Sequence, residues 1–521
     1  MIPLYSTSQI REIDNFAINE LGVPSIVLME NASLQIFDAI QSEIIKLGKI
    51  KRIGAVCGKG NNGGDGFAVL RHFVNNGFKV AVIHIGKEKE MTEDCRINFR
   101  ILRKMSATNT DIIIQEYSSL KDLALIAKSQ IILDCMLGSG AQGELREPYK
   151  GIVDSLNKLK AIRVAIDIPT GLDADLGTGN TVFNSDFTIT LGDYKKGLFV
   201  GQGYANCGNV IKGDIGIAPQ YFEKLQVEDY LIEPEDAFKS LPVKGKNIHK
   251  YSAGKVLTIA GSGSFPGAAV LTSKSALKAG AGASILAFPR SVRNLVHKKL
   301  GEVVVHAYED QKREHLSVDD IKKLNEKIKW ADVTAIGPGL GRDEETQSAV
   351  LKILEEKKCN KFVIDADAIF ALGKNNYQDI DLKDFVLTPH HAEFANLINV
   401  SINELRANMF RHCKEFVSRT GAYLVLKGAP TVIFNPEGES LVNSAGNPGM
   451  AKFGTGDVLT GVIAGLMSQQ KDIEKSVIAG VYLHSLAADL LVAKKTEYSY
   501  TAEDIIRSLP SSFNFIKRSF V

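Results

Sequence analysis

The sequence lacks long hydrophobic runs and an excess of charge of either sign. In its 521 residues, apolar stretches are broken by glycine or charge before about 18 positions, so no membrane-spanning helix is expected. The first residues carry no apolar segment of the kind that forms a signal peptide. The 62 Lys and Arg residues nearly balance the 60 Asp and Glu residues, giving a formal charge of +2. We therefore expect neither a nucleic acid nor a membrane as a partner.

Cysteine and tryptophan are also scarce. The six cysteines, at positions 57, 95, 135, 207, 359 and 413, are at least 38 residues apart and form no CxxC pair. This spacing argues against a zinc site and against a disulfide framework, and predicts reduced, mostly buried thiols in a cytoplasmic protein. Tryptophan occurs only as Trp330, whereas glycine occurs 46 times. The positions of these glycines carry most of the functional information.

Length and hydrophobic patterning predict an α/β protein. A content of 45% hydrophobic and 23% charged residues is ordinary for globular chains, and the length suggests two or three domains. Helical periodicity over Ser8–Leu21 and Ser25–Leu47, with Ser8 and Ser25 as caps, precedes a first alternating series. Its expected strands are Arg52–Cys57, Lys79–Ile85, Asp111–Gln115, Gln130–Cys135, Ile162–Ile168, Asp186–Leu191 and Gly208–Ile215.

A second alternating series follows a polar stretch over residues 219–251, which reads as a linker. Its expected strands are Lys255–Ala260, Ala283–Ala287, Glu302–Ala307, Val333–Ile336, Lys361–Ile364, Phe385–Leu387, Tyr423–Leu426 and Thr431–Phe434. Continuous apolar strands alternating with helices indicate parallel sheets that are covered on both faces. We therefore predict two three-layer αβα domains, the first of them a Rossmann-like doubly wound sheet.

A first glycine cluster, Gly58–Gly66, lies between the expected strand Arg52–Cys57 and a helix expected from about Phe67. Its G-x-G-x-x-G spacing suits the approach of an anionic ligand to backbone amides. The second expected strand, however, ends in His84-Ile85-Gly86 and lacks the acid of a dinucleotide site. A tight turn with Asp65 as a helix cap is the alternative interpretation.

Two more polar segments follow expected strands of this series. Asp134 precedes the glycine-rich loop Gly138–Glu144, and Asp167 opens a polar stretch that runs to Asp175. Ligands of doubly wound sheets bind at the carboxyl ends of the strands, so three such segments predict a site there. A lone Asp167 is otherwise most often a turn or capping residue.

The segments GKGNNGGDGFAVLRH, LDCMLGSG and AIDIPTGLDADLG resemble the NAD(P)H-hydrate epimerase domain over residues 1–218. The resemblance implies interconversion of the R and S hydrates at C6 of the damaged nicotinamide ring. It implies Asp167 as the acid/base residue, and K⁺ held by Asn62, Asp134 and Thr170. The loop after Gly138 departs from the usual family pattern, and Lys195 matches a family lysine. The implied substrate contacts are Asn61, Asn62, Gly63, Gly64, Asp65, Gly138, Ser139, Gly140, Ala141, Gln142, Gly143, Glu144, Tyr149 and Asp167.

A second glycine cluster ends in Gly454-Thr455-Gly456-Asp457, directly before the apolar run Val458–Met467. Backbone N–H groups at such a helix start form an anion hole suited to a phosphoryl group, and Asp457 could accept a proton there. The alternative is that Asp457 only caps the helix. Three more polar segments follow expected strands: Gly337–Arg342, Asp365–Ala368 (to orient the site or a hydrated metal) and Lys427–Thr431.

The stretch NPGMAKFGTGDVLTG, with GPGLGR, LTPHHAEF and LKGAPT, resembles the ADP/ATP-dependent NAD(P)H-hydrate dehydratases of the ribokinase-like superfamily over residues 225–521. The resemblance implies phosphorylation of the C6 hydroxyl with Asp457 as base, then loss of phosphate, with Mg²⁺ and ADP or ATP. The implied substrate contacts are Ala268 or Ala269, Gly339, His390 and Asp457. The implied nucleotide contacts are Lys427, Gly428, Ala429, Pro430, Thr431 and Gly456.

Together the two resemblances predict a repair enzyme acting on NADHX and NADPHX as a cytoplasmic homo-oligomer. Two alternatives remain at this point. The chain could be a ribokinase-like vitamin or sugar kinase with an unrelated N-terminal domain, or its N-terminal domain could be a binding module without catalysis.

Overall fold

The computed structural model describes residues 1–47, 50–141, 143–358 and 361–520. The chain divides into two compact units. The N-terminal unit comprises residues 3–229, and the C-terminal unit comprises residues 1–2 and 230–521. Each unit is built around its own β-sheet.

The N-terminal unit contains a seven-stranded sheet in the order β4-β3-β2-β5-β6-β7-β8, with every neighbouring pair parallel. Its strands are β2 (Arg52–Cys57), β3 (Lys79–His84), β4 (Ile112–Glu116), β5 (Ile131–Cys135), β6 (Ile162–Ile166), β7 (Phe187–Leu191) and β8 (Asn209–Gly213). Its helices are α1 (Thr7–Asn19), α2 (Ser25–Ala39), α3 (Asn61–Asn75), α4 (Glu93–Ser106), α5 (Tyr149–Leu156), α6 (Gly201–Asn206) and α7 (Pro219–Phe222).

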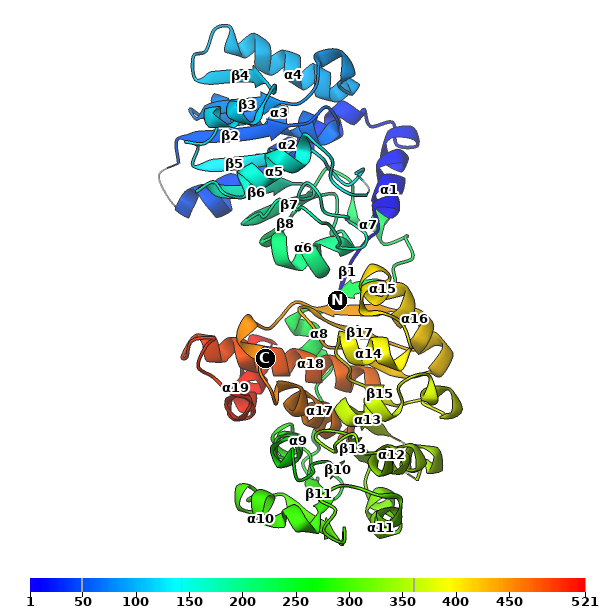
Figure 1. Ribbon diagram of the computed structural model, residues 1–521. Coiled ribbons are helices and arrows are strands. Elements are labelled where there is room, and N and C mark those ends of the chain that lie inside the picture. Colours follow the sequence, from blue (N-terminus) through cyan, green and yellow to red (C-terminus); the bar gives the residue numbers. More distant parts are fainter. Residues whose placement is uncertain (48–49, 142, 359–360, 521) are drawn as a thin grey trace. The chain divides into compact units, whose positions relative to one another are not determined.

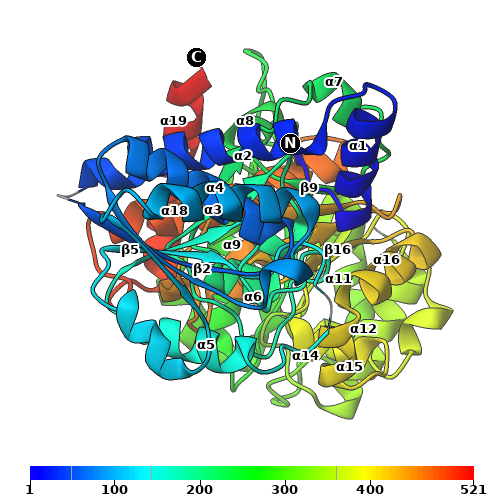
Figure 2. The same cartoon turned by 90° about the horizontal axis from the view of Figure 1, so that it is seen from above.

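Side chains that alternate along each strand build a hydrophobic core on both faces of this sheet. Ile53, Ala55 and Cys57 of β2 join the cluster under α2, α3 and α4, whereas Val56 joins the cluster under α5. Figure 2 shows α2, α3 and α4 on one side of β2 and β5 and α5 on the other. The predicted doubly wound, three-layer architecture is confirmed.

The C-terminal unit contains an eleven-stranded sheet in the order β1-β9-β18-β17-β16-β15-β14-β13-β10-β11-β12. Neighbouring strands are parallel throughout the part of the sheet with the order β16-β15-β14-β13-β10-β11-β12. Strand β17 pairs antiparallel with β16, and β18 pairs antiparallel with β17. The strands are β1 (Ile2–Pro3), β9 (Asp229–Leu231), β10 (Lys255–Ile259), β11 (Ala283–Pro289), β12 (Val304–Tyr308), β13 (Val333–Ile336), β14 (Phe362–Ile364), β15 (Val386–Leu387), β16 (Tyr423–Leu426), β17 (Thr431–Phe434) and β18 (Ser440–Asn443).

Helices cover this second sheet on both faces, with α9, α17 and α18 on one side and α11, α12 and α16 on the other (Figure 1). The helices are α8 (Pro234–Lys239), α9 (Pro266–Lys278), α10 (Arg293–Val296), α11 (Ile321–Trp330), α12 (Glu344–Glu356), α13 (Ala366–Ala371), α14 (His391–Leu397), α15 (Ile402–Ala407), α16 (Met409–Thr420), α17 (Thr455–Met467), α18 (Ile473–Val492) and α19 (Ala502–Phe520). The second predicted α/β architecture is also confirmed.

Every strand expected in the two series is present, with ends that differ by a few residues, but several short elements were not predicted. The stretch 219–251 contains α7, β9 and α8 rather than linker alone, and β18 was missed. The first helix begins earlier than predicted because Ser6, not Ser8, is its cap. The Ser6 hydroxyl accepts from the Gln9 amide (3.2 Å), and the Gln9 side chain accepts from the Ser6 amide (2.8 Å).

One helix, α18, is long and apolar enough to cross a membrane by length and composition, which the run-length argument did not predict. In this structure 72% of its apolar window is buried within the unit, and its side chains belong to the core shared with α17 and α19. This degree of burial is typical of a helix in the hydrophobic core of a protein unit. Five cysteines, Cys57, Cys95, Cys135, Cys207 and Cys413, are free and buried as expected, and Cys359 lies outside the described residues.

Candidate active sites

The first glycine cluster forms the start of helix α3 rather than a loop. The helix begins at Asn61 with Gly60 at its N-cap, so the helix start predicted near Phe67 is wrong by about two turns. Asp65 therefore lies inside the helix and does not cap it. The alternative interpretation of this segment as a turn capped by Asp65 is excluded.

Close packing explains why the first turns of α3 are so rich in glycine. A Cβ on Gly63 would lie 2.0 Å from the Gly58 carbonyl oxygen, and one on Gly66 would lie 2.7 Å from the Cys135 Cβ. Both distances are far below van der Waals contact, so α3 can rest on β2 and β5 only without side chains there. This close approach places the side chains of Asn61, Asn62 and Asp65 at the carboxyl ends of the strands.

Replacing Gly63 with alanine is expected to destabilise the N-terminal unit by about 3 kcal/mol, because the new methyl group collides with backbone that cannot rotate away. Urea unfolding measured on the whole chain would show this as a transition of the N-terminal unit at lower urea concentration. Gly60→Ala is the matched control, since no atom lies within 4 Å of its added Cβ. Equal stability of the two variants would contradict this explanation of the glycines.

A cavity of about 720 Å³ opens where these strand ends meet. The predicted residues that line it are Asn61, Asn62, Asp65, Gly138, Ser139, Gly140, Ala141, Tyr149 and Asp167. Among the predicted residues that the structure describes, Gly63, Gly64, Gly143 and Glu144 lie outside its lining. Glu144 accepts instead from the Asn180 side chain (2.6 Å), and Gln142 is outside the described residues.

Asp167 and Lys195 form a buried ion pair in this cavity. The Lys195 Nζ donates to Asp167 Oδ1 (2.7 Å), and the backbone amide of Ser139 donates to Oδ2 (3.2 Å). Burial raises the pKa of Asp167, but the charge and hydrogen bonds of Lys195 outweigh it and lower that pKa below its ordinary value. Asp167 is thus an ionised carboxylate that faces a ligand-sized cavity.

Of the three residues implied for K⁺, Asn62 lines this cavity, whereas Asp134 and Thr170 are buried and are not among its lining residues. Asp134 is fully buried, and it accepts from the Thr170 amide (2.8 Å) and the Thr170 hydroxyl (2.8 Å). Burial raises the pKa of Asp134 to about 6. Both polar side-chain atoms of Asn62 are buried without a hydrogen-bond partner among the described residues. Such an unpaired amide oxygen needs a ligand, and it suits a weakly charged cation as well as substrate.

Helix α1 supplies one wall of the cavity, and the sequence analysis missed it. Arg11, Asp14 and Asn15 of this helix line the cavity, together with Thr92 and Asp94 near the start of α4. Asp14 lies one turn after the buried Ile10, so it follows a core position of the helix. An acidic residue four positions after a core residue of the helix was the signal in the sequence that could have identified Asp14 as a cavity residue.

In the C-terminal unit, the second glycine cluster leads into helix α17 as predicted. The N-cap is Gly454 with a φ of 91°, a conformation that favours glycine, and Asp457 lies in the first turn. A Cβ on Gly456 would lie 3.2 Å from the Lys427 Nζ, so this lysine reaches the helix start. The free amides at the helix start and the ammonium of Lys427 together form an anion-binding site.

Asp457 is poised to accept a proton near neutral pH. Burial and then the charge of Asp365 raise the pKa of Asp457 to about 7, against a lowering effect of Lys427. Helix α17 has no side-chain hydrogen bond at its N-cap, so the alternative interpretation of Asp457 as a helix cap is excluded. A carboxyl with this pKa beside an anion site is suited to general base catalysis.

Asp365 fixes the position of Lys427. Its Oδ1 accepts from the Lys427 Nζ (2.7 Å) and its Oδ2 from the Thr460 hydroxyl (2.6 Å). Asp367, two residues on, accepts from the Gly341 amide (2.9 Å) and so shapes the turn after β13. Both aspartates are therefore engaged within the protein, which favours the orienting role predicted for this segment over metal binding. No cluster of three or more His, Cys, Asp or Glu side chains suited to a metal occurs in the described ranges.

The remaining predicted contacts lie in different surroundings. A Cβ on Gly339 would lie 3.0 Å from the half-buried Ala268, whereas Ala269 is fully buried in the core. His390 caps α14, with its Nδ1 accepting from the Ala392 and Glu393 amides, yet its side chain is 55% exposed. The segment Lys427, Gly428, Ala429, Pro430 and Thr431 forms the turn between β16 and β17.

Both units are similar to known protein families. A family model described as NAD(P)H-hydrate dehydratase matches residues 256–511, and one described as YjeF-related protein N-terminus matches residues 25–197. Relatives that match nearly the whole chain carry the name bifunctional NAD(P)H-hydrate repair enzyme Nnr. The one from Moorella thermoacetica is 33% identical over 97% of this chain and 96% of its own. The one from Coxiella burnetii is 31% identical over 98% of this chain and 99% of its own.

Among solved structures, the ADP/ATP-dependent NAD(P)H-hydrate dehydratase of Bacillus subtilis, co-crystallised with ATP and Mg²⁺, is similar to part of the chain. It is 29% identical, covers 55% of this chain and 98% of its own, and has a TM-score of 0.47.

Proposed function

Because this chain belongs to the family of bifunctional NAD(P)H-hydrate repair enzymes, we propose that it repairs hydrated NADH and NADPH in two steps. The N-terminal unit interconverts the R and S hydrates, and the C-terminal unit dehydrates the S form with ADP or ATP as phosphoryl donor. We assign the first activity to residues 1–218 and the second to residues 225–521. A kinase with an unrelated N-terminal domain is not favoured, since the named relatives span both units.

The geometry at the start of α17 carries the dehydratase proposal. Asp457, which is half protonated near neutral pH, takes the proton of the C6 hydroxyl as that oxygen attacks the phosphoryl group. The amides at the start of α17 and the ammonium of Lys427 hold the transferred group and its nucleotide. Phosphate then leaves from C6, driven by the lone pair of the ring nitrogen, and loss of a proton from C5 to solvent restores NAD(P)H.

The ion pair of Asp167 and Lys195 carries the epimerase proposal. Asp167 is ionised, lies at the edge of a cavity of about 720 Å³, and can exchange a proton with the C6 hydroxyl or with water. Lys195 cannot move away, because its ammonium also donates to the Thr190 hydroxyl (3.1 Å) and the Leu191 carbonyl. The base is thus held in one orientation.

Two ions complete the proposal. Asn62, Asp134 and Thr170 would hold K⁺, which suits their oxygen-rich and nearly neutral character. When bound, K⁺ supplies positive charge beside the epimerase cavity, and Mg²⁺ bound with ADP or ATP neutralises nucleotide phosphates. We further propose a homo-oligomer in the cytoplasm, the location being supported by five free buried thiols.

An assay with separate R and S hydrates tests the function. With ADP or ATP, the S hydrate is expected to regain absorbance at 340 nm directly, and the R hydrate only after epimerisation. Without a nucleotide, the R hydrate should still convert to the S hydrate faster than in a blank without protein. If neither donor restores absorbance, the dehydratase proposal fails. If the R hydrate converts no faster than the blank, the epimerase proposal fails.

A further inference from the structure

Two carboxyl groups of the epimerase cavity have no hydrogen-bond partner in the described part of the chain. Asp65 is 7% exposed, and Asp14 is half-buried on α1. Both line the cavity together with Asp167. Buried carboxylates are normally paired or hydrogen-bonded, and these two are not. They face the space where substrate would lie.

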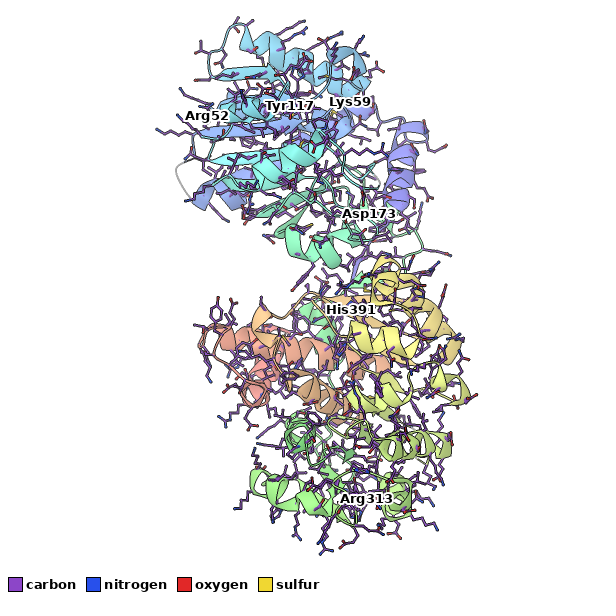
Figure 3. All side chains as sticks on the ribbon, in the orientation of Figure 1. Arg52, Lys59, Tyr117, Asp173, Arg313 and His391 are labelled. Carbon is purple, nitrogen blue, oxygen red and sulfur yellow. The ribbon has the colours of Figure 1, made fainter. Side chains whose placement is uncertain are left out.

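The cationic residues lining the cavity are already committed elsewhere. All three donors of the Lys195 ammonium are used, on Asp167 (2.7 Å), Thr190 (3.1 Å) and Leu191 (2.5 Å). The Arg11 guanidinium donates to the Ser139 carbonyl (3.3 Å). Lys59, labelled in Figure 3, lies 3.6 Å from Glu90. Neither unpaired carboxyl therefore has a counterion.

The surroundings of Asp65 favour its protonated form. Burial, followed by the charges of Asp167, Asp14 and Asp94, raises the pKa of Asp65 well above its ordinary value, and Lys195 opposes this only in part. Its helix neighbours Gly64 and Gly66 pack against Cys57, Cys95 and Cys135. Burial raises the pKa of Cys95 and Cys135, so these two thiols are neutral. Asp167, in contrast, is kept ionised by Lys195. Two carboxyl groups with opposed protonation states are the requirement for acid and base on one substrate.

We propose that Asp65 is the general acid of the epimerase, that Asp167 in the same cavity is its base, and that Asp14 is a positioning residue for the proton of Asp65. This inference rests on the proposed epimerase function. The proton of Asp65 passes to the C6 hydroxyl, the C6–O bond breaks, and water leaves as the ring nitrogen lone pair forms an N=C6 bond. Water then adds to C6 from the other face, and Asp167 takes its proton. Solvent in the cavity returns the proton from Asp167 to Asp65.

The variant Asp65→Asn keeps the size of the side chain but cannot donate this proton. We expect its epimerase kcat to fall at least about 100-fold with KM nearly unchanged. Dehydration of the S hydrate by the same protein should be unaffected, and an unchanged urea transition of the N-terminal unit verifies the fold of that unit. In the wild type, kcat should fall at high pH as Asp65 ionises, and this alkaline limb should be missing in the variant. A variant with the wild-type kcat and alkaline limb would overturn the proposal.

The variant Asp14→Asn removes one charge that raises the pKa of Asp65. We expect the alkaline limb of its kcat profile to move down by roughly one pH unit, and the position of this limb, not the maximal rate, is the readout. An alkaline limb that does not move would overturn the role of Asp14.

Isotope labelling of the wild type tests the cleavage of the C6–O bond. In H₂¹⁸O without nucleotide, each S hydrate formed from the R hydrate should carry one ¹⁸O at C6, after subtraction of the label found in an enzyme-free blank. Epimerisation without label would overturn C6–O cleavage, whereas a wild type that does not epimerise at all would instead refute the proposed function.

Discussion

Replacing Asp457 with asparagine is expected to lower the rate of S-hydrate dehydration by about 10³- to 10⁴-fold. Asparagine fills the same space at the start of α17 but cannot accept the proton of the C6 hydroxyl. Nucleotide affinity should change little, because Lys427 remains paired with Asp365 (2.7 Å) and the backbone amides stay in place. Stopped assays at 340 nm and calorimetric titration with ADP would measure the two quantities.

The wild-type pH profile gives an independent test of this base. Since the pKa of Asp457 is raised to about 7, the carboxyl is protonated below that pH and cannot accept a proton. The dehydration rate should therefore fall with decreasing pH through about 7. The variant Asp319→Asn, at an exposed position of the same unit, is the matched control and should keep the wild-type rate and profile. Substantial dehydration by Asp457→Asn would exclude Asp457 as the base.

The strands and the strand-end segments could be predicted from the sequence because they depend on local pattern. Continuous apolar runs mark parallel strands wherever they fall, and ligand-binding segments follow the carboxyl ends of such strands. The start of α3 could not be predicted in this way. The glycines Gly60, Gly63, Gly64 and Gly66 disfavour a helix locally, and only the packing of α3 on β2 and β5 overrides that preference.

The charge networks of both sites were the least predictable part. Lys427, Asp365 and Thr460 come from three elements separated by 62 and 95 residues, and only the folded sheet brings them together. In the epimerase cavity, Asp14 is supplied by a helix that lies ahead of the whole strand series. Such contacts depend on tertiary packing, and no local spacing encodes them.

Replacing Asp167 with asparagine is expected to lower epimerisation of the R hydrate by about 10²- to 10⁴-fold and to leave S-hydrate dehydration unchanged. The amide oxygen of the new side chain would still accept from Lys195, but the amide could not take a proton from water. The exposed residue Asp154 supplies the matched control, Asp154→Asn, for the loss of one carboxylate in the same unit. Chiral chromatography of the hydrates, with no nucleotide present, would measure the rate. An epimerase rate in Asp167→Asn equal to that of the control would remove Asp167 from the reaction.

The role of Lys195 in keeping that base ionised predicts a contrast between the two activities of one chain. Because the pKa of Asp167 is lowered, epimerisation should persist down to about pH 5, where dehydration is already lost with the protonation of Asp457. In Lys195→Met the largest effect opposing burial is gone, and only the amides of Ser139 and Leu191 still lower the pKa of Asp167. That pKa therefore rises, and the acid limb of epimerisation moves to higher pH. Dehydration in the same variant reports whether the C-terminal unit is intact, and the urea transition of the N-terminal unit reports whether that unit is folded. An acid limb that stays in place would show that Lys195 does not control the charge of Asp167, whereas a limb that moves while dehydration is unchanged assigns the shift to this one buried ion pair.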